Sequence, residues 1–486
     1  MCEIDRGCPD QLLSKCAHSL AVLTEDIDLD GATVTVPYSC ALNQTDLIQN
    51  CNKFCVVQLL TRDNEAFFLV TRAGRVGYEG ASSLDCFLDR ETAINAFKTM
   101  FAERTGRQWS TRYENLDAPV PKGKYQYILM KYDNAATAKV DGQDVIAPKL
   151  PAAVDQLLHI IYDPDLYNEA RSMGLDTRRL PLGDLGKAQI SKAYKILRDL
   201  NAAVAKGPEA GVSVNHELVS LSALYYSTIP TASGMSKLPT LDTAERISEK
   251  MELLELLDNM CYLNKAGTDT YKQYQSLQCN IEEETNGATL AMIRQYLTTN
   301  AGHTHSYQPR IVRVYRIDRP AEKASYLPWS ALHNRQLLWH GTRLSNAVGI
   351  LSRGMQINPV GIATNGKMFG NGLYFANAST KSAQYMYVSS GGHGVLLLCE
   401  VALGNMYEIT HATSLSKETL PSGKHSTRGL GTYQPNEHTH VRLADGVIVP
   451  IGKLEESDKN GKSLLYDEFI VYDPSQIALR YFVLVQ

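Results

Sequence analysis

Three polar residues of the kinds that enzymes use for chemistry lie inside or beside short apolar runs of this 486-residue chain. They are His340, Tyr374 and Glu468, in that order along the sequence. The runs are rich in Leu, Val, Phe and Tyr and are interrupted by Gly and Asn, a pattern typical of buried strands. We therefore expect a sheet to hold the imidazole, the phenol and the carboxylate more rigidly than a loop would.

Glu468 is the most informative of the three. In strand alternation it shares one face with Leu464, Tyr466, Ile470 and Tyr472. No basic partner is evident for it, and burying an unpaired carboxylate is costly. A carboxylate that is buried at this cost usually has a function, and catalysis is the commonest one. His340 taken alone would instead be an ordinary hydrogen-bonded core histidine.

The surrounding residues resemble a known family. Residues 337–343 read Leu-Leu-Trp-His-Gly-Thr-Arg, residues 368–376 read Met-Phe-Gly-Asn-Gly-Leu-Tyr-Phe-Ala, and residues 381–385 read Lys-Ser-Ala-Gln-Tyr. With Leu-Leu-Tyr-Asp-Glu-Phe-Ile-Val-Tyr at 464–472, they resemble the catalytic domain of the poly(ADP-ribose) polymerase family. That family carries a His-Tyr-Glu triad on a split β-sheet. The resemblance covers about residues 290–486.

The resemblance implies a transferase that takes NAD as its substrate and uses His340, Tyr374 and Glu468 as the triad. Loss of nicotinamide from the ribose leaves an oxocarbenium-like sugar, as in glycoside hydrolysis. Glu468 would hydrogen-bond the 2′-hydroxyl of the nicotinamide ribose, stabilise the cationic sugar and orient the acceptor hydroxyl. The chain has no Gly-rich phosphate loop of the Rossmann or P-loop kind, which argues against NAD as a hydride carrier.

The same resemblance assigns the contacts to NAD. The backbone of Gly341 and the hydroxyl of Ser382 would grip the carboxamide, and Tyr385 would stack on the pyridine opposite Tyr374. Lys367 stands where the family usually has Tyr, and we expect it to contact the pyrophosphate. The full NAD-binding set is His340, Gly341, Thr342, Lys367, Tyr374, Phe375, Ser382 and Tyr385, with Lys381 and Met368 on the acceptor side. An exposed lysine such as Lys381 would otherwise be only a solvated charge.

Residues 36–133 read as strands with one helix at 89–104, where apolar residues recur at helical spacing. Residues 72–78 read Arg-Ala-Gly-Arg-Val-Gly-Tyr, and the segment resembles the WGR domain of the DNA-break-dependent members of the same family. Ala73 replaces the family's Trp, which puts stacking on a terminal base in doubt. The resemblance implies DNA contacts by Gly74, Arg75 and Trp109. The alternative is a solvated β-domain for protein contacts.

Residues 134–148 read as a linker, and helical patterns follow over residues 149–274. Leu150-Pro151 and Pro181-Leu182-Gly183-Asp184-Leu185 resemble the family's helical regulatory domain. Composition alone would indicate only a helix bundle. Because this region lies between the DNA-sensing segment and the NAD site in the sequence, we expect it to restrain the transferase.

The composition of the chain limits the classes of protein to which it can belong. With 44% hydrophobic and 21% charged residues, the chain has the composition of an ordinary globular protein, and a length of 486 suggests about three domains. The net charge of −4 gives no overall positive field, so any DNA contact must be local. The N-terminus does not resemble a secretory signal, and no run of eighteen apolar residues predicts a membrane span.

The ten cysteines contain no Cys-x-x-Cys pair, so we expect free thiols and no metal. The alternative is an unusual metal cluster of Cys2, Cys8, Cys16 and His18.

We therefore predict a multidomain α+β protein resembling the DNA-break-dependent members that lack zinc fingers. The expected parts are an arm at 1–35, a WGR-like domain at 36–133, a linker at 134–148, a helical domain at 149–274 and a split antiparallel sheet domain at 275–486. The resemblance implies a nuclear poly(ADP-ribose) polymerase, with damaged DNA, protein acceptors and an accessory protein at the acceptor site as partners. The alternative is a mono-ADP-ribosyltransferase, or a DNA- or protein-binding module with a degenerate transferase domain.

Overall fold

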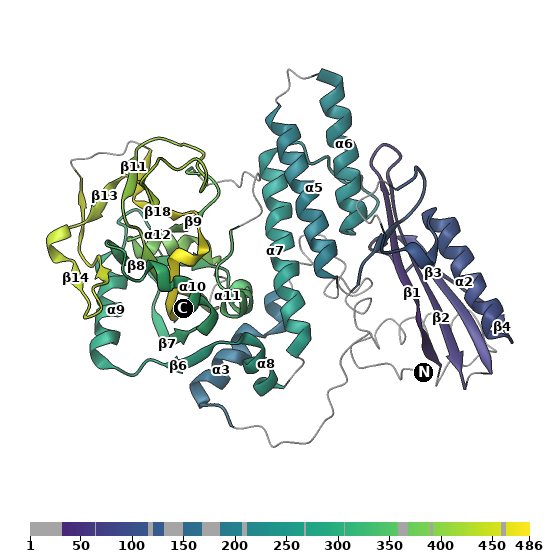
Figure 1. Cartoon of the computed structure of the whole chain (residues 1–486), viewed down its shortest axis with the longest axis horizontal. Helices are drawn as coiled ribbons and strands as arrows, with labels where there is room; N and C mark the ends of the chain where they lie inside the picture. The colour runs from purple at the N-terminus through teal and green to yellow at the C-terminus, as the bar shows by residue number, and fades with distance from the viewer. Residues whose placement is uncertain are drawn as a thin grey trace. The chain divides into compact units, whose positions relative to one another are not determined.

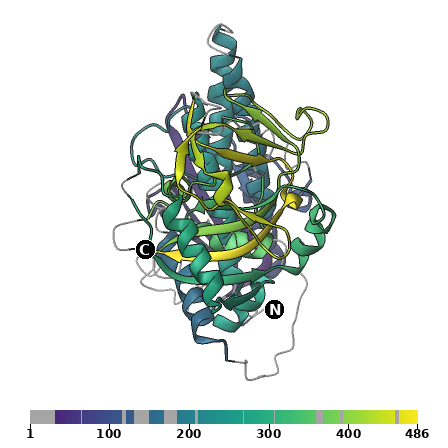
Figure 2. The same cartoon turned by 90° about the vertical axis from the view of Figure 1, so that its left-hand side faces the viewer.

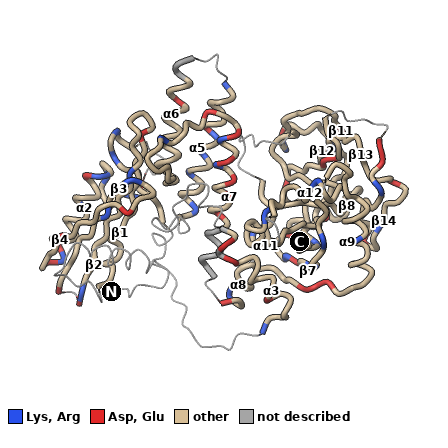
Figure 3. The backbone as a smooth tube through the Cα atoms, turned by 180° about the vertical axis from the view of Figure 1, so that it is seen from behind, with Lys and Arg blue, Asp and Glu red and all other residues tan. Residues whose placement is uncertain are grey.

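The computed structural model divides into two compact units, one of residues 1–144 and 168–264 and one of residues 145–167 and 265–486 (Figure 1). The residues that it describes are 32–63, 65–114, 120–130, 149–167, 185–206, 211–266, 269–305, 307–357, 368–388, 392–457 and 463–486. Helices and several sheets occur together, which confirms the expected multidomain α+β class. Figure 3 shows basic and acidic residues interspersed along both units, in keeping with the small net charge.

The first unit contains an antiparallel sheet of strand order β4-β3-β2-β1-β5. The strands are β1 (Thr33–Asp46), β2 (Cys51–Arg62), β3 (Ala66–Arg75), β4 (Ala81–Phe87) and β5 (Gln126–Ile128). Helix α2 (Arg90–Thr105) buries Phe97 and Phe101 against this sheet. Asp89 caps its N-terminus by accepting the Thr92 N–H, and Gly106 ends it at a φ of 72°.

Three long helices, α5 (Lys187–Ala205), α6 (Gly211–Thr228) and α7 (Ala244–Ala266), belong to the same unit up to residue 264. Buried amides tie this part of the chain to the sheet. Asn43 Nδ2 donates to the Tyr226 carbonyl at 2.8 Å, and Asn52 Nδ2 donates to the Thr231 carbonyl at 2.9 Å. Paired buried amides fix the sheet and the helices in one arrangement.

The second unit carries the expected split sheet, which Figure 2 turns toward the viewer. The larger sheet has the order β14-β15-β8-β10-β19-β7-β6, with strands Val441–Arg442, Ile448–Val449, Arg335–Thr342, Gly394–Ala402, Ile477–Val485, Ile311–Asp318 and Asn280–Glu283. The second has the order β11-β12-β18-β9, with strands Met406–Ile409, Ser426–Gly429, Glu468–Val471 and Leu373–Phe375. A third has the order β16-β13-β17, with strands Leu454–Glu456, Gly431–Pro435 and Leu464–Tyr466.

A backbone bridge between Trp339 and Ala376 links the first two of these sheets. The Trp339 ring is fully buried, and its centroid lies 5.0 Å from that of Tyr296 in helix α9 (Gly287–Thr299). This packing anchors the end of β9 to the core of the larger sheet.

The helices of the expected domain at 149–274 are divided between the two units. Helices α3 (Ala152–Ile161) and α8 (Thr270–Leu277) belong to the unit of the split sheet, whereas α5 and α6 belong to the other. Tyr315 of β7 donates a buried hydrogen bond to the Ala153 carbonyl at 2.9 Å, which fixes α3 on the sheet. Helical periodicity indicates that helices exist, but not which core buries each apolar face.

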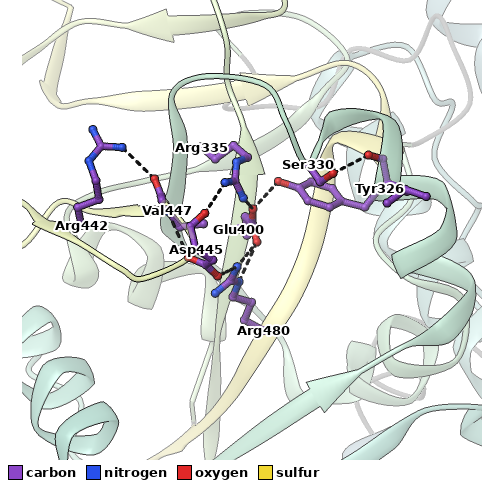
Figure 4. A network of polar contacts seen from close by, with 10 residues as sticks. Tyr326, Ser330, Arg335, Glu400, Arg442, Asp445, Val447 and Arg480 are labelled. Atoms are coloured by element: carbon purple, nitrogen blue, oxygen red, sulfur yellow. Dashed lines mark hydrogen bonds and ion pairs between the residues drawn. The ribbon is translucent and has the colours of Figure 1, made fainter.

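A buried carboxylate holds the three central strands of the larger sheet together (Figure 4). Glu400 of β10 is 3% exposed. Its Oε1 accepts hydrogen bonds from Tyr326 at 2.7 Å and from Arg335 of β8 at 2.5 Å. Its Oε2 accepts from Arg480 Nε of β19 at 2.8 Å.

Among the described helices, none is both long and apolar enough to cross a membrane.

Candidate active site

The end of strand β8 places His340 beside strand β9. Its Nδ1 lies 2.8 Å from the Tyr374 carbonyl oxygen. Because a carbonyl can only accept, Nδ1 carries the proton and the neutral ring has its acceptor lone pair on Nε2. The ring of Phe375 lies 5.6 Å from the imidazole, centroid to centroid. This orientation suits a histidine that accepts a hydrogen bond from a hydroxyl.

Strand pairing brings Tyr374 next to the strand of Glu468. Tyr374 pairs with Ile470, and Phe375 pairs with Phe469, in an antiparallel register. The Tyr374 hydroxyl donates to the Gly370 carbonyl at 2.8 Å and accepts the Phe369 N–H at 3.0 Å. Burial raises the pKa of Tyr374 well above its usual value, so the phenol is neutral. Both bonds fix the ring at the edge of the site.

Glu468 has a basic partner, contrary to the sequence interpretation. Lys381 Nζ lies 2.8 Å from Glu468 Oε1 and also donates to the Tyr466 carbonyl at 3.0 Å. The side chains are 13% and 8% exposed, so Lys381 is not a solvated charge. Burial lowers the pKa of Lys381, and the Glu468 charge opposes that shift. The pair was missed because its members lie 87 positions apart in the sequence.

The second carboxylate oxygen of Glu468 distinguishes the pair from a purely structural salt bridge. Glu468 Oε2 is buried and makes no hydrogen bond to any described residue. A buried charged oxygen without a partner is costly, because it has lost water and gained nothing. It is therefore a candidate acceptor for a ligand hydroxyl.

Gly341 near the end of β8 and Ser382 of helix α12 (Ser379–Ala383) come together where these two elements pack against each other. A Cβ at position 341 would lie 1.7 Å from the Ser382 carbonyl oxygen, so only glycine fits this close backbone approach. The Ser382 hydroxyl donates to the Trp339 carbonyl at 3.1 Å. Thr342 Oγ1 accepts from Asn346 Nδ2 at 3.0 Å. The backbone is therefore tightly packed at the residues predicted to hold the carboxamide.

The remaining expected contacts differ in exposure. Tyr385 is 49% exposed, and its pKa is raised by partial burial and, secondarily, by the Glu468 charge. Its exposure leaves ring surface for stacking. Phe375 is buried, whereas Met368 is only partly buried. Lys367 lies outside the described residues.

The residues predicted to contact DNA lie in different surroundings. Trp109 is 4% exposed, and its ring packs edge-on against Phe97 and Phe101, both at 4.8 Å between centroids. The indole is therefore a core side chain of this unit, and its contact with DNA stays a prediction. A Cβ at Gly74 would lie 2.5 Å from Gly80 Cα, so this glycine permits close strand approach.

The Arg75 guanidinium is engaged within its own unit. Nε donates to the Gly234 carbonyl at 2.6 Å, and Nη1 donates to the Asn50 carbonyl at 3.0 Å. Nη2 donates to Asn50 Oδ1 at 3.0 Å and to the Ser236 carbonyl at 3.1 Å. Arg75 thus joins the β1–β2 turn to the loop at 233–236, and its contact with DNA stays a prediction.

Taken together, the split sheet, the His-Tyr-Glu arrangement and the Gly341–Ser382 contact define the catalytic class of NAD-dependent ADP-ribosyltransferases. Comparison with family models agrees. The poly(ADP-ribose) polymerase catalytic domain matches residues 288–486, the regulatory domain of the same polymerases matches 148–280, and the WGR domain matches 38–115. Within the part of the chain that the structure describes, no cluster of His, Cys, Asp or Glu is placed to hold a metal ion.

Curated relatives identify the family. The chain is 35% identical over 474 residues to poly [ADP-ribose] polymerase 2 of Arabidopsis thaliana, covering 92% of this chain and 73% of that protein. It is 36% identical over 461 residues to poly [ADP-ribose] polymerase 1 of Gallus gallus, covering 91% of this chain and 44% of that protein. The chain belongs to the poly(ADP-ribose) polymerase family.

Proposed function

We propose that this chain is a poly(ADP-ribose) polymerase that transfers ADP-ribose from NAD to protein acceptors, releases nicotinamide and responds to DNA strand breaks. The observation that carries the proposal is the buried Oε2 of Glu468, on the strand that pairs with the strand of Tyr374, with Oε1 held by Lys381. A fixed negative charge in a water-poor site is what a developing sugar cation requires.

In the proposed reaction the bond between the nicotinamide nitrogen and ribose C1′ breaks, and its electron pair leaves with neutral nicotinamide. The resulting sugar cation is attacked by an acceptor hydroxyl, which gives up its proton to water as the new C1′–O bond forms. Glu468 Oε2 accepts a hydrogen bond from the 2′-hydroxyl of the nicotinamide ribose, and the carboxylate charge stabilises the sugar cation. Gly341 and Ser382 hold the carboxamide, and Tyr385 stacks on the pyridine ring. His340 Nε2 and Thr342 hold the adenosine ribose.

The proposed partners are broken DNA, bound by the WGR-like domain, and protein acceptors, with an accessory protein completing the acceptor side. The proposed location is the nucleus. Ala73 lacks a stacking ring, and Arg75 is engaged within its own unit. Both features favour a DNA contact that differs from insertion of a Trp ring.

Incubating the full chain with labelled NAD, with and without a short broken duplex, tests the proposal. A ladder of labelled products that grows with DNA supports the polymerase. A single labelled band would instead indicate mono-transfer, and no label would indicate a binding module.

A further inference from the structure

A second buried carboxylate immediately precedes Glu468. Asp467 is 0% exposed, and both of its oxygens are occupied. Oδ2 accepts from Arg428 Nε at 3.0 Å and from Arg428 Nη2 at 2.7 Å. Oδ1 accepts the Gly431 N–H at 2.7 Å. An acidic residue so placed is fixed at every polar atom, unlike Glu468.

Arg428 lies on the strand that pairs with the strand of Glu468. Strand β12 is antiparallel to β18, with Arg428 opposite Phe469 and Gly429 opposite Glu468. The guanidinium also donates to Gln434 Oε1 at 2.5 Å and to Glu408 Oε1 at 3.3 Å. Its side chain is 9% exposed. A planar guanidinium that is hydrogen-bonded at all three of its nitrogens fixes both the position and the orientation of the carboxylate that it contacts.

The backbone between the two carboxylates is held from both sides. Lys381 contacts the Tyr466 carbonyl and Glu468 Oε1, which flank Asp467. Arg428 and the Gly431 N–H hold Asp467 itself. Residue 467 separates β17 from β18, so no ladder hydrogen bond of those strands fixes it. Side-chain contacts therefore take the place of strand pairing at this point.

Arg428 also affects how the charges of Asp467, Glu468 and Lys381 are paired. Two adjacent buried carboxylates, Asp467 and Glu468, face two cations, Arg428 and Lys381, and Arg428 also contacts the more exposed Glu408. The Lys381 ammonium bonds to the residues on either side of Asp467, and the Asp467 charge, like that of Glu468, opposes the lowering of its pKa. Without Arg428, a buried Asp467 would therefore compete with Glu468 for Lys381.

We propose that Arg428 and Asp467 form a positioning pair, which fixes the backbone at 466–468 and keeps Lys381 committed to Glu468. This inference rests on the proposed function, since the pair acts on transfer only through Glu468. The competing explanation is an ion pair that contributes to folding alone.

The test compares Asp467→Asn, Arg428→Gln, Arg428→Lys and the double variant Asp467→Asn/Arg428→Gln in the full chain. The readouts are nicotinamide release from NAD, resolved into kcat and KM, and the melting temperature. Glu400→Gln is the matched control, because it also removes a buried carboxylate charge that faces two arginines, away from the proposed site.

We expect each single neutral variant to lower kcat about tenfold or more while KM for NAD changes less than about threefold. Arg428→Lys should recover part of kcat because it restores the charge. The double variant should lose less than the product of the two single losses, as coupled residues do. Glu400→Gln should lower the melting temperature with kcat preserved. Unchanged kcat in both single variants, or a loss matched by Glu400→Gln at equal loss of melting temperature, would overturn the proposal.

A crystal structure of Arg428→Gln gives a readout that does not depend on turnover. The proposal expects the Lys381 ammonium to move from Glu468 toward Asp467, and a Lys381 that stays on Glu468 Oε1 would contradict it. Should the unmodified chain show no transfer, the proposed function fails, and the position of Lys381 still decides whether the pair governs Glu468.

Discussion

Lys381 Nζ and Glu468 Oε1 lie 2.8 Å apart, and both side chains are almost completely buried. The contact joins helix α12 to strand β18, which pairs with the strand of Tyr374. It compensates the carboxylate charge without occupying Oε2. The carboxylate is therefore paired at one oxygen and can still offer the other to a substrate.

The buried ammonium predicts an alkaline limb in the pH profile. Burial lowers the pKa of Lys381, although Glu468 opposes the shift. Lys381 is charged below its pKa and neutral above it, so the pair is lost as pH rises, starting below the ordinary lysine pKa of about 10.4. We expect kcat to fall on that side. Lys381→Arg should move the fall to higher pH, because arginine keeps its proton.

The measurement is kcat for nicotinamide release across the alkaline range. Lys417→Arg is the control, since Lys417 is an exposed lysine in the same unit. An alkaline limb that is the same in the unmodified chain and in Lys381→Arg would contradict the role given to this ammonium.

The sequence predicted the strands that carry His340, Tyr374 and Glu468, because short apolar runs interrupted by Gly are a local signal. It could not predict the partner of Glu468, since the contact depends on how helix α12 packs against β17 and β18. The burial of Trp109 could not be predicted for a related reason, since only the packing of Phe97 and Phe101 against the indole shows it.

Arg75 is expected to stabilise the first unit. Its guanidinium bonds to Gly234, Ser236 and Asn50, so Arg75→Ala should reduce the free energy of unfolding by roughly 1–2 kcal/mol after allowance for partial exposure. Arg75→Lys should not restore the free energy of unfolding fully, because an ammonium cannot reproduce the forked set of hydrogen bonds that the guanidinium makes. Urea denaturation measures the change. Lys53→Ala, at the exposed position opposite on β2, is the control.

The same variants test the DNA contact predicted for Arg75. If the guanidinium keeps its internal bonds when DNA binds, Arg75→Ala should leave the salt dependence of DNA affinity unchanged. A reduction of the slope by about one would instead assign Arg75 to a phosphate.

The helical region between the matched WGR and catalytic domains is predicted to restrain transfer. We expect a chain that lacks residues 168–264, with 167 joined to 265 by a flexible linker, to label acceptors faster than the full chain without DNA. Coupling of this kind is typically about 1–3 kcal/mol, or roughly 5–150-fold. The DNA response should disappear.

This deletion keeps α3 and α8, which belong to the unit of the split sheet. A chain starting near residue 275 would lose the Tyr315–Ala153 contact and is expected to melt at a lower temperature. A folded deletion variant that is no faster than the DNA-free full chain would make the region a spacer rather than a restraint.

The most direct test of the whole account is Glu468→Gln, measured as initial transfer of label from NAD in the presence of a broken duplex. Gln keeps the size of the side chain and removes the charge that the sugar cation needs. The account predicts that NAD still binds, while transfer falls on the order of 10²-fold or more. Turnover close to that of the unmodified chain would contradict the assignment of Glu468 and, with it, the proposed site.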